Sequence, residues 1–366
     1  MSDITRYDSH MLAPQVTDGV AWYDVTALHI EGLGWTDTQH PLDRLPARAE
    51  GKVPAAVWDL CRHSTGLSVR FLTDAEQINA RWTLRFESLA MDHMPATGCS
   101  GVDLYVLDEQ QRWRWLGVGR QPRFPVSQCS LITTLTPQLR QYQLYFPLYN
   151  GVHKVEIGLP PEAKIMPAPT RLDKPVCIYG SSIVQGGCAS RPGMAYPAML
   201  GRRLNRDIIN LGFSGSARAE QEVADLLAEL DPAVFVIDCL PNIDPAIQQA
   251  INVQRLEYLI RTLLSAHPST PILFVENIVY QNQHLAQNQK TSRASRNACW
   301  HVAQQRLHGD PPANLHLLHT LTGDHLLGDD RDATVDGTHP NDLGFARIAD
   351  AIEPVLRQLL VGRESQ

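Results

Sequence analysis

The sequence predicts a chain in two parts, an all-β half followed by an α/β half. Up to about residue 165, short runs alternate apolar and polar side chains, as strands with one buried face do. Beyond a proline-rich stretch at residues 160–169, short apolar runs alternate with helical patterns instead. We therefore predict domains at residues 1–165 and 166–366, in keeping with roughly 150 residues per domain.

The first half shows its strands most clearly at residues 81–89, where Trp82, Leu84 and Phe86 interleave with polar side chains. Further alternating runs lie at residues 67–71, 102–107, 142–146 and 155–159. Asn150-Gly151 is a turn signal between two of them. Because no long amphipathic helix is evident here, we predict an all-β sandwich of the jelly-roll kind.

In the second half, five short apolar runs predict buried strands at residues 176–179, 207–211, 233–237, 272–276 and 315–318. Helical patterns lie between and after them, at residues 196–204, 220–230, 248–266, 293–307 and 343–360. Strands of this kind, joined by helices, form a parallel sheet covered on both faces. Since ligands bind at the carboxyl ends of such strands, we expect the functional residues in the loops after them.

Four of these loops carry polar or small residues, and each has an ordinary structural explanation when taken alone. The segments at residues 180–187 and 210–217 could be simple glycine-rich turns, and Asn242 could be a turn residue. Asp336 and His339 share a loop just before the last helix, which Asn341 or Asp342 could equally cap. Neither glycine-rich segment has the pattern of a phosphate-binding loop.

Taken together, the four loops supply a complete set of groups for acyl transfer. Ser182 can attack a carbonyl if His339 takes its proton and Asp336 orients the imidazole. The resulting oxyanion needs hydrogen-bond donors, each worth roughly 3 kcal/mol of barrier. The backbone N–H groups of Ser182 and Gly215 and the side-chain amide of Asn242 can form that oxyanion hole. The sequence thus predicts a serine hydrolase.

The C-terminal half resembles the SGNH, or GDSL-like, hydrolase superfamily, whose four blocks supply a serine, a glycine, an asparagine and a histidine. Ser182, Gly215, Asn242 and His339 match these blocks in chain order, and Asp336 matches the acid three residues before the histidine. The resemblance implies a three-layer α/β/α, flavodoxin-like domain with a parallel five-stranded sheet.

Within that superfamily the chain is similar to a subgroup with two further signatures. The first is a Gly-x-Ser-x-Val nucleophile block, here Gly180, Ser182 and Val184. The second is an N-terminal β-sandwich marked by Gly-x-Asp-Leu-Tyr, here Gly101, Asp103, Leu104 and Tyr105. The resemblance therefore spans nearly the whole chain.

Two blocks depart from the superfamily's usual pattern. Ser181 stands where the Gly-Asp-Ser block has its acid, and residues 240–243 read Leu-Pro-Asn-Ile in place of Gly-x-Asn-Asp. Neither change removes a reacting group, but both reshape the pocket wall. The substrates of lipolytic branches are therefore not carried over.

The resemblance implies a serine esterase acting on small acyl esters, with O-acetyl groups on carbohydrate-like compounds as the expected substrates. It implies no cofactor, and a sandwich domain that narrows or completes the pocket. Acyl transfer to an alcohol by the same residues is an alternative. A catalytically silent glycan-binding protein is disfavoured because all five chemical positions are filled. The α/β-hydrolase fold is disfavoured because Gly-x-Ser-x-Gly is missing.

Composition disfavours nucleic-acid and membrane partners, which is consistent with the small-molecule ester that the resemblance implies. Thirty-two basic against 39 acidic residues give a net charge of −7, which disfavours nucleic acid. The apolar runs are too short for a membrane span, and the first 20 residues contain no secretory signal. Seven scattered cysteines without a C-x-x-C pair suit free thiols, so we expect a cytoplasmic protein. No feature indicates an oligomeric state.

Other candidate groups have weaker patterns. His316, His319 and His325 match no zinc spacing, so we expect no metal site. Arg293 and Arg296 could clamp an anionic substrate or form a solvated helical face. Several aromatic residues of the first half could stack on sugars, although core packing explains most of them better: Trp113, Trp115, Tyr142, Tyr145 and Tyr149.

Overall fold

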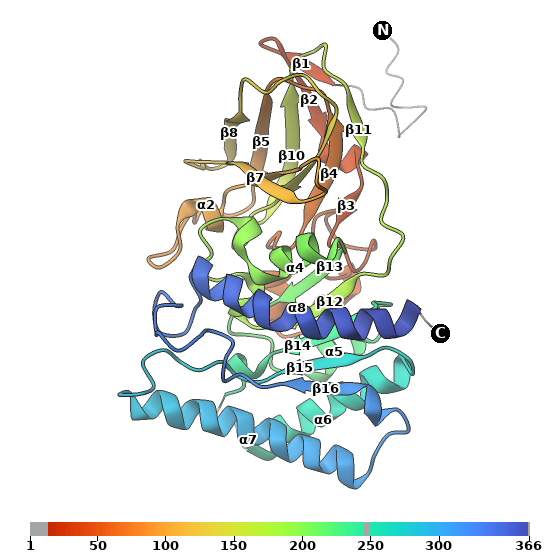
Figure 1. Cartoon of the computed structure of the whole chain (residues 1–366), viewed down its shortest axis with the longest axis vertical. Coiled ribbons are helices and arrows are strands. Elements are labelled where there is room, and N and C mark those ends of the chain that lie inside the picture. The colour runs from red at the N-terminus through yellow and green to blue at the C-terminus, as the bar shows by residue number, and fades with distance from the viewer. Residues whose placement is uncertain (1–13, 245–248, 365–366) are drawn as a thin grey trace. The chain divides into compact units, whose positions relative to one another are not determined.

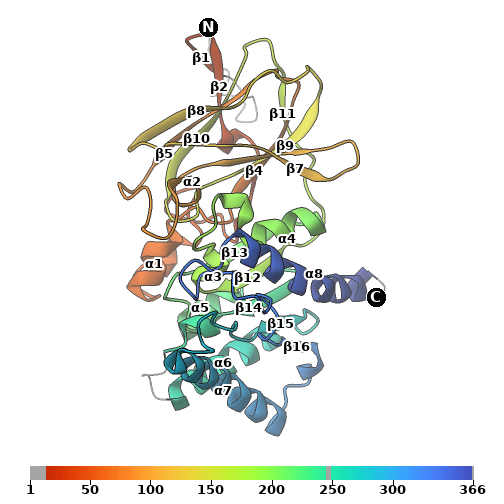
Figure 2. The ribbon, with the colours of Figure 1, turned by 60° about the vertical axis from the view of Figure 1, so that its left-hand side comes forward.

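The computed structural model describes residues 14–244 and 249–364, and its chain divides into two compact units (Figures 1 and 2). The described residues of the first unit come from Met1–Arg44, Arg62–Arg171 and Ser190–Gly193. Those of the second come from Leu45–Cys61, Leu172–Ala189 and Met194–Gln366. Leu45–Cys61, which includes α1 (Ala55–Cys61), was expected in the sandwich. It groups with the second unit, where Arg48 forms an ion pair with Glu229.

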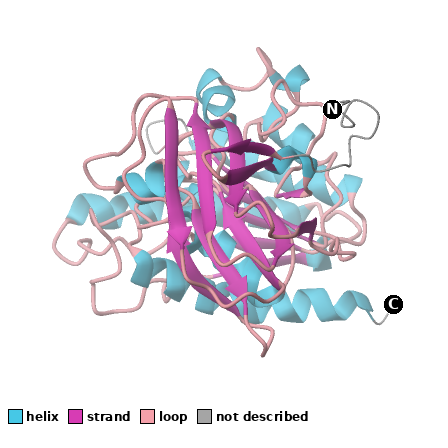
Figure 3. Cartoon of the chain, turned by 90° about the horizontal axis from the view of Figure 1, so that it is seen from above, coloured by secondary structure: helices cyan, strands magenta, loops and turns pink. Residues whose placement is uncertain are grey.

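The first unit is an antiparallel β-sandwich, as predicted (Figure 3). One sheet has the strand order β1 (Gln15–Thr17), β2 (Val20–Asp24), β10 (Val152–Leu159), β5 (Ile78–Leu84) and β8 (Val126–Ile132). The other has the order β11 (Ile165–Pro167), β4 (Ser68–Thr73), β9 (Arg140–Tyr145), β6 (Asp103–Leu107) and β7 (Trp113–Val118), with β3 (Ile30–Glu31) paired to β4. A short helix, α2 (Ala96–Cys99), precedes β6.

The alternating pattern fills the core between these sheets, since Trp82 and Leu84 are each only 1% exposed. The predicted run at residues 81–89 is too long, because β5 ends at Leu84. Beyond that point the N–H group of Phe86 donates to the side chain of Asn150 (3.0 Å) instead of to a neighbouring strand. Tyr142 and Tyr145 are core residues, whereas Trp115 is half exposed.

Asp103 of the Gly-x-Asp-Leu-Tyr signature is a buried ionic centre of this unit. Its carboxylate is fully buried and accepts hydrogen bonds from Trp115 Nε1 (3.0 Å), Arg191 Nη1 (2.9 Å) and the N–H group of Gly193 (2.8 Å). Arg191 also donates to the hydroxyl of Tyr105 (2.5 Å). A side chain at position 193 would collide with the Tyr105 ring. The signature therefore holds the segment Ser190–Gly193 within the first unit.

The second unit contains a five-stranded parallel sheet. Its strand order is β13 (Ile208–Gly212), β12 (Val176–Gly180), β14 (Val234–Asp238), β15 (Ile272–Val275) and β16 (Leu318–Leu321). The longer helices are α4 (Tyr196–Leu204), α5 (Gln221–Leu227), α6 (Gln249–Ala266), α7 (Gln287–Gly309) and α8 (Asp342–Glu364). Helix α4 packs with α8, and α6 packs with α5 and α7, so helices cover both faces (Figure 1). This is the predicted three-layer α/β/α fold with flavodoxin-like strand order.

The sequence misplaced the last strand by three residues. Residues 315–317 form a 3-10 turn, and β16 begins at Leu318, which pairs with Ile272 of β15. Helix α7 begins at Gln287, six residues before the predicted start, because its first turns are polar and show no apolar periodicity. Residue 248, the predicted start of the preceding helix, lies outside the described residues. Among the described helices none has the length and apolar character needed to cross a bilayer.

We predict that Asp103→Ala lowers the free energy of unfolding by about 3 kcal/mol, since it leaves the partly buried Arg191 without its carboxylate. Urea unfolding followed by circular dichroism measures this. The control is Glu109→Ala, which removes an exposed carboxylate near the β6–β7 turn and is expected to change stability far less. Equal stabilities of the two variants would show that the buried ion pair does not stabilise the sandwich.

Candidate active site

Ser182 lies at the carboxyl end of β12, where the strand turns into the short helix α3 (Ser182–Gln185). Ser181 caps this helix, because its hydroxyl accepts a hydrogen bond from the N–H group of Ile183 (3.3 Å). Gly186 ends it in the left-handed conformation (φ 101°). The serine that replaces the usual acid of this block thus holds the turn that presents Ser182.

Two glycines allow α3 to pack directly onto the sheet. A Cβ atom at Gly180 would collide with the carbonyl of Asp238 on the neighbouring strand β14. At Gly212 it would collide with the backbone nitrogen of Gln185 in α3. The ends of β13, β12 and β14 are therefore held together by backbone contacts.

Buried amide side chains tie α3 to the loop that carries Gly215. Asn210 donates through Nδ2 to the carbonyl of Val184 (2.8 Å), and Gln185 Oε1 accepts from the N–H group of Ser214 (2.9 Å). Gly215 has φ +67°, a left-handed conformation that favours glycine. Asn210 and Gln185 were not predicted as site residues, although polar residues within these two glycine-rich segments were the available signal.

Asn242 ends a 3-10 turn (Leu240–Asn242) that follows β14. Its Nδ2 donates to the carbonyl of Phe213 in the loop after β13 (3.0 Å). Since β13 and β14 flank β12, this bond links the two loops on either side of the strand that leads to Ser182. It also fixes the amide orientation, with the nitrogen facing the loop of Gly215.

The fourth loop brings His339 to the serine. The distance from Ser182 Oγ to His339 Nε2 is 2.9 Å, and that from His339 Nδ1 to Asp336 Oδ2 is 2.6 Å. Because an ionised carboxylate only accepts, Nδ1 carries the proton and Nε2 accepts from the serine hydroxyl. Asn341 Oδ1 caps α8 through the N–H group of Gly344 (3.0 Å), so Asp336 is not needed as the cap.

Asp336 is held in its ionised form. Partial burial raises the pKa of its carboxyl group. Hydrogen bonds from the His339 ring and from the N–H groups of His339 (2.7 Å) and Thr338 (2.9 Å) outweigh burial, so the pKa lies below its ordinary value. The carboxylate is therefore available to stabilise an imidazolium at neutral pH.

The segment after β15 holds the Asp336–His339 loop through hydrogen bonds. The N–H group of Gln281 donates to the carbonyl of Gly337 (2.9 Å), and its Oε1 accepts from the N–H group of Ala333 (3.5 Å). Gly337 has φ +90° and lies between Asp336 and His339 in the chain. Gln281 is a further supporting residue that the sequence analysis did not single out, since the segment has no recognisable motif.

Arg293 and Arg296 do not form the anion clamp considered from the sequence. Arg293 Nε donates to the carbonyls of Asn277 and Ile278 (both 3.1 Å), and Arg296 Nε donates to that of Ile243 (2.9 Å). The two guanidinium groups bind the backbone of the loops after β15 and β14. Neither is simply part of a solvated helical face.

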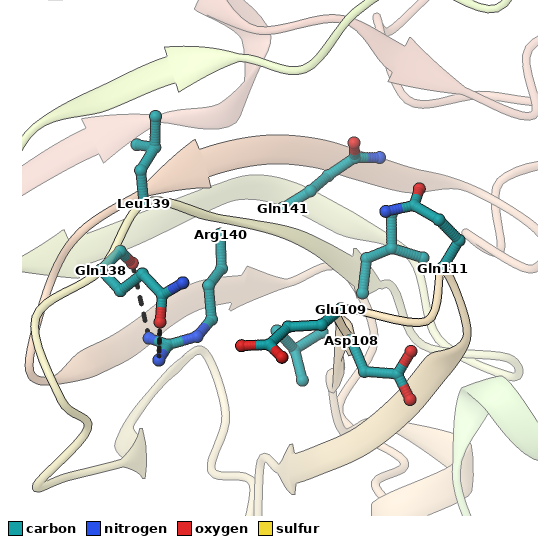
Figure 4. Close-up of a pocket in the computed structure, with 9 residues that line it drawn as sticks. Asp108, Glu109, Gln111, Gln138, Leu139, Arg140 and Gln141 are labelled. Carbon is teal, nitrogen blue, oxygen red and sulfur yellow. Dashed lines mark hydrogen bonds between the residues drawn. The ribbon is translucent and has the colours of Figure 1, made fainter.

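A pocket of about 440 Å³ in the first unit lies between the β6–β7 turn and the start of β9 (Figure 4). Its Arg140 donates to Gln138 Oε1 (2.8 Å), and its Asp108 accepts from Arg112 and Arg114. The other polar side chains that line it are Glu109, Gln111 and Gln141. None of the lining residues is a serine, cysteine or histidine, so this pocket supplies no hydroxyl, thiol or imidazole nucleophile of those residues.

Asp238, at the end of β14, is a buried acid beside the nucleophile turn. Its Oδ2 accepts from the hydroxyl of Tyr196 (3.0 Å), while its Oδ1 has no partner among the described residues. Burial raises the pKa of Asp238 to about 7, although the Tyr196 hydrogen bond opposes this. The ionised form of Asp238 is therefore disfavoured in the folded protein below about pH 7.

A parallel sheet with a serine, a histidine and a carboxylate joined at its carboxyl edge is the arrangement of a serine hydrolase. Residues 173–357 match the model of the GDSL-like lipase/acylhydrolase family. Residues 20–165 match the model of the N-terminus of SGNH-hydrolase-type esterases. The chain belongs to the GDSL-like lipase/acylhydrolase family and is a serine ester hydrolase.

Solved structures share the fold of this chain. A Bacteroides ovatus protein described as a GDSL-like lipase is 30% identical, with a TM-score of 0.86 over 93% of this chain and 98% of its own. A salicylyl-acyltransferase from a tetracycline biosynthetic pathway is 15% identical, with a TM-score of 0.68 over 95% of this chain and 93% of its own. A family two carbohydrate esterase from Cellvibrio japonicus is 15% identical, with a TM-score of 0.54 over 81% and 89%. No curated protein sequence matches the chain.

The raised pKa of Asp238 predicts a pH-dependent stability. Because the folded state binds this proton more tightly than the unfolded state, stability is lost as the pH rises from about 4 to about 7. Asp238→Asn removes this titration. The stability of that variant relative to wild type is therefore expected to increase across the window and to level off above it.

Urea unfolding at pH 4.5, 5.5, 6.5 and 7.5 tests this. Asp225→Asn is the matched control, since Asp225 also accepts from a tyrosine hydroxyl (Tyr258, 2.7 Å) but is exposed. A difference between Asp238→Asn and wild type that does not vary with pH would contradict the assignment.

Proposed function

We propose that this protein is a serine esterase that cleaves small acyl esters, acetyl esters first among them, through an acyl-enzyme on Ser182. The observation that carries the proposal is the continuous hydrogen-bonded chain from Ser182 Oγ through the His339 ring to Asp336. It lies at the carboxyl edge of the parallel sheet, next to a loop glycine and an oriented asparagine amide. These are the groups that ester hydrolysis requires.

In the proposed acylation, Ser182 Oγ attacks the ester carbonyl carbon while His339 Nε2 accepts the hydroxyl proton. The carbonyl electron pair moves to oxygen, and Asp336 stabilises the imidazolium. His339 then gives the proton to the leaving alcohol oxygen as the ester C–O bond breaks. Water, losing a proton to His339, next attacks the acyl-enzyme, and Ser182 recovers that proton as the carboxylic acid departs.

The oxyanion is proposed to bind the N–H groups of Ser182 and Gly215 together with the amide of Asn242. One proton of the Asn242 amide is engaged by the carbonyl of Phe213. The other proton, about 120° away in the same plane, is the one we assign to the oxyanion. The bond to Phe213 thus prevents the amide from turning its oxygen toward the negative charge.

Acetyl esters of carbohydrate-like alcohols are the proposed substrates, and the sandwich is proposed to select them. This choice rests on the resemblance to the SGNH subgroup and on the fold shared with a family two carbohydrate esterase over 81% of this chain. An acetyl xylan esterase from Butyrivibrio proteoclasticus, 12% identical with a TM-score of 0.54 over 93% of this chain, shares the fold. We propose action on a small-molecule ester in the cytoplasm, with no nucleic-acid or membrane partner.

Acyl transfer to an alcohol is the second candidate. The likeness to the salicylyl-acyltransferase, over 95% of this chain, is the observation in its favour. The same residues would act, with an acceptor hydroxyl in place of water. Product analysis with an alcohol acceptor present separates the two, because hydrolysis releases the free acid and transfer yields a new ester.

Ser182→Ala is expected to lower kcat for 4-nitrophenyl acetate by about 10³-fold or more, since no other group in the chain of hydrogen bonds can form the acyl-enzyme. Spectrophotometric release of 4-nitrophenolate measures this. Ser216→Ala, in the neighbouring glycine-rich loop, is the matched control and is expected to stay active. Retention of activity by folded Ser182→Ala would falsify the nucleophile assignment.

A further inference from the structure

Arg296 on α7 contacts two separate loops at the sheet edge. Its Nε donates to the carbonyl of Ile243 (2.9 Å), and its Nη1 donates to the hydroxyl of Tyr280 (2.9 Å) and to the hydroxyl of Ser292. The guanidinium carbon lies 5.9 Å from the centre of the Tyr280 ring. The side chain is half buried. It therefore bridges elements that are 37 residues apart in the chain.

The first contact reaches the oxyanion segment. Ile243 directly follows Asn242, is fully buried, and donates its N–H group to the carbonyl of Leu240 (3.0 Å). That bond closes the 3-10 turn that carries Asn242. The turn is thus held by Arg296 at the Ile243 carbonyl and by Phe213 at the Asn242 amide.

The second contact reaches the support of the acid–base loop. The hydroxyl of Tyr280, a buried residue, also accepts from Asn277 Nδ2 (3.0 Å). The next residue, Gln281, donates its N–H group to the carbonyl of Gly337, between Asp336 and His339. Arg296 therefore binds the residue next to Asn242 on one side. On the other side it is linked to the acid–base loop through two hydrogen bonds, one to the Tyr280 hydroxyl and one from the following residue, Gln281, to Gly337.

We propose that Arg296 is a positioning residue that keeps the Asn242 turn in register with the Asp336–His339 loop. The inference rests on the proposed function and extends it to a residue that does not touch the substrate. A guanidinium suits this role because its planar fork donates to two acceptors at once, and hydrogen bonds from a charged donor are stronger than neutral ones. A lysine ammonium lacks that fork.

The test is a double-mutant cycle on 4-nitrophenyl acetate hydrolysis. Arg296→Ala in the wild-type background is expected to lower kcat by about 10- to 100-fold with KM changed less than about three-fold, since Asn242 stabilises the oxyanion mainly in the transition state. In the Asn242→Ala background, the factor by which Arg296→Ala lowers kcat is expected to be at least about five-fold smaller than in the wild-type background. Tyr280→Phe leaves the contact between Arg296 and Ile243 in place, so it is expected to lower kcat by the same factor in both backgrounds.

An Arg296→Ala loss of equal size in both backgrounds would overturn the proposal, because a merely structural role would be additive. Arg306→Ala is the control on the same helix, since Arg306 is half exposed and pairs with Glu257 (3.8 Å). Arg296→Lys, which keeps the stem and the charge, is measured as the second variant in case the alanine variant does not fold, and is expected to show the same non-additivity. Full activity of Ser182→Ala would contradict the proposed function. If Ser182→Ala is inactive but Arg296→Ala lowers kcat equally in both backgrounds, only the role of Arg296 is contradicted.

Discussion

The close packing of α3 on the ends of β13, β12 and β14 is the constraint on which the rest of the site depends. Gly180 and Gly212 leave no room for a Cβ atom, so backbone meets backbone at both positions. Because protein interiors are packed to near crystal density, such contacts leave α3 little room to shift. Ser182 is the first residue of α3, so this packing also holds Ser182 in place. Its distance to His339 then depends on the Asp336–His339 loop, which Gln281 holds through the carbonyl of Gly337.

Side-chain amides and one guanidinium group connect this packed region to the other loops of the site through hydrogen bonds. Asn210 links α3 to β13, Gln185 links α3 to the Gly215 loop, and Asn242 bonds from the β14 loop to Phe213. On the other side, Gln281 holds the Asp336–His339 loop while Arg296 binds the segment that precedes Gln281. In a low-dielectric site, such oriented dipoles need no rearrangement when negative charge develops. The framework therefore matters as much as the groups that react.

The sequence predicted the fold class, most strands of the second unit and the loops that meet at its edge, because buried strands and glycine-rich turns leave local signals. It could not predict that Leu45–Cys61 groups with the second unit, since local periodicity does not report which surface a segment covers. It likewise placed the last strand too early, where parallel pairing with β15 decides the register. The supporting residues Gln185, Gln281 and Arg296 act through backbone carbonyls and N–H groups, which have no sequence motif.

The central claim is that Ser182, Gly215 and Asn242 surround one oxyanion. A crystal structure of the enzyme inactivated by a small alkyl phosphonate ester tests it most directly, because the phosphoryl oxygen takes the place of the carbonyl oxygen in the tetrahedral intermediate. We expect a covalent bond from Ser182 Oγ to phosphorus. We also expect the phosphoryl oxygen about 2.7–3.1 Å from the N–H groups of Ser182 and Gly215 and from Asn242 Nδ2. An adduct on another residue, or a phosphoryl oxygen directed away from these donors, would contradict it.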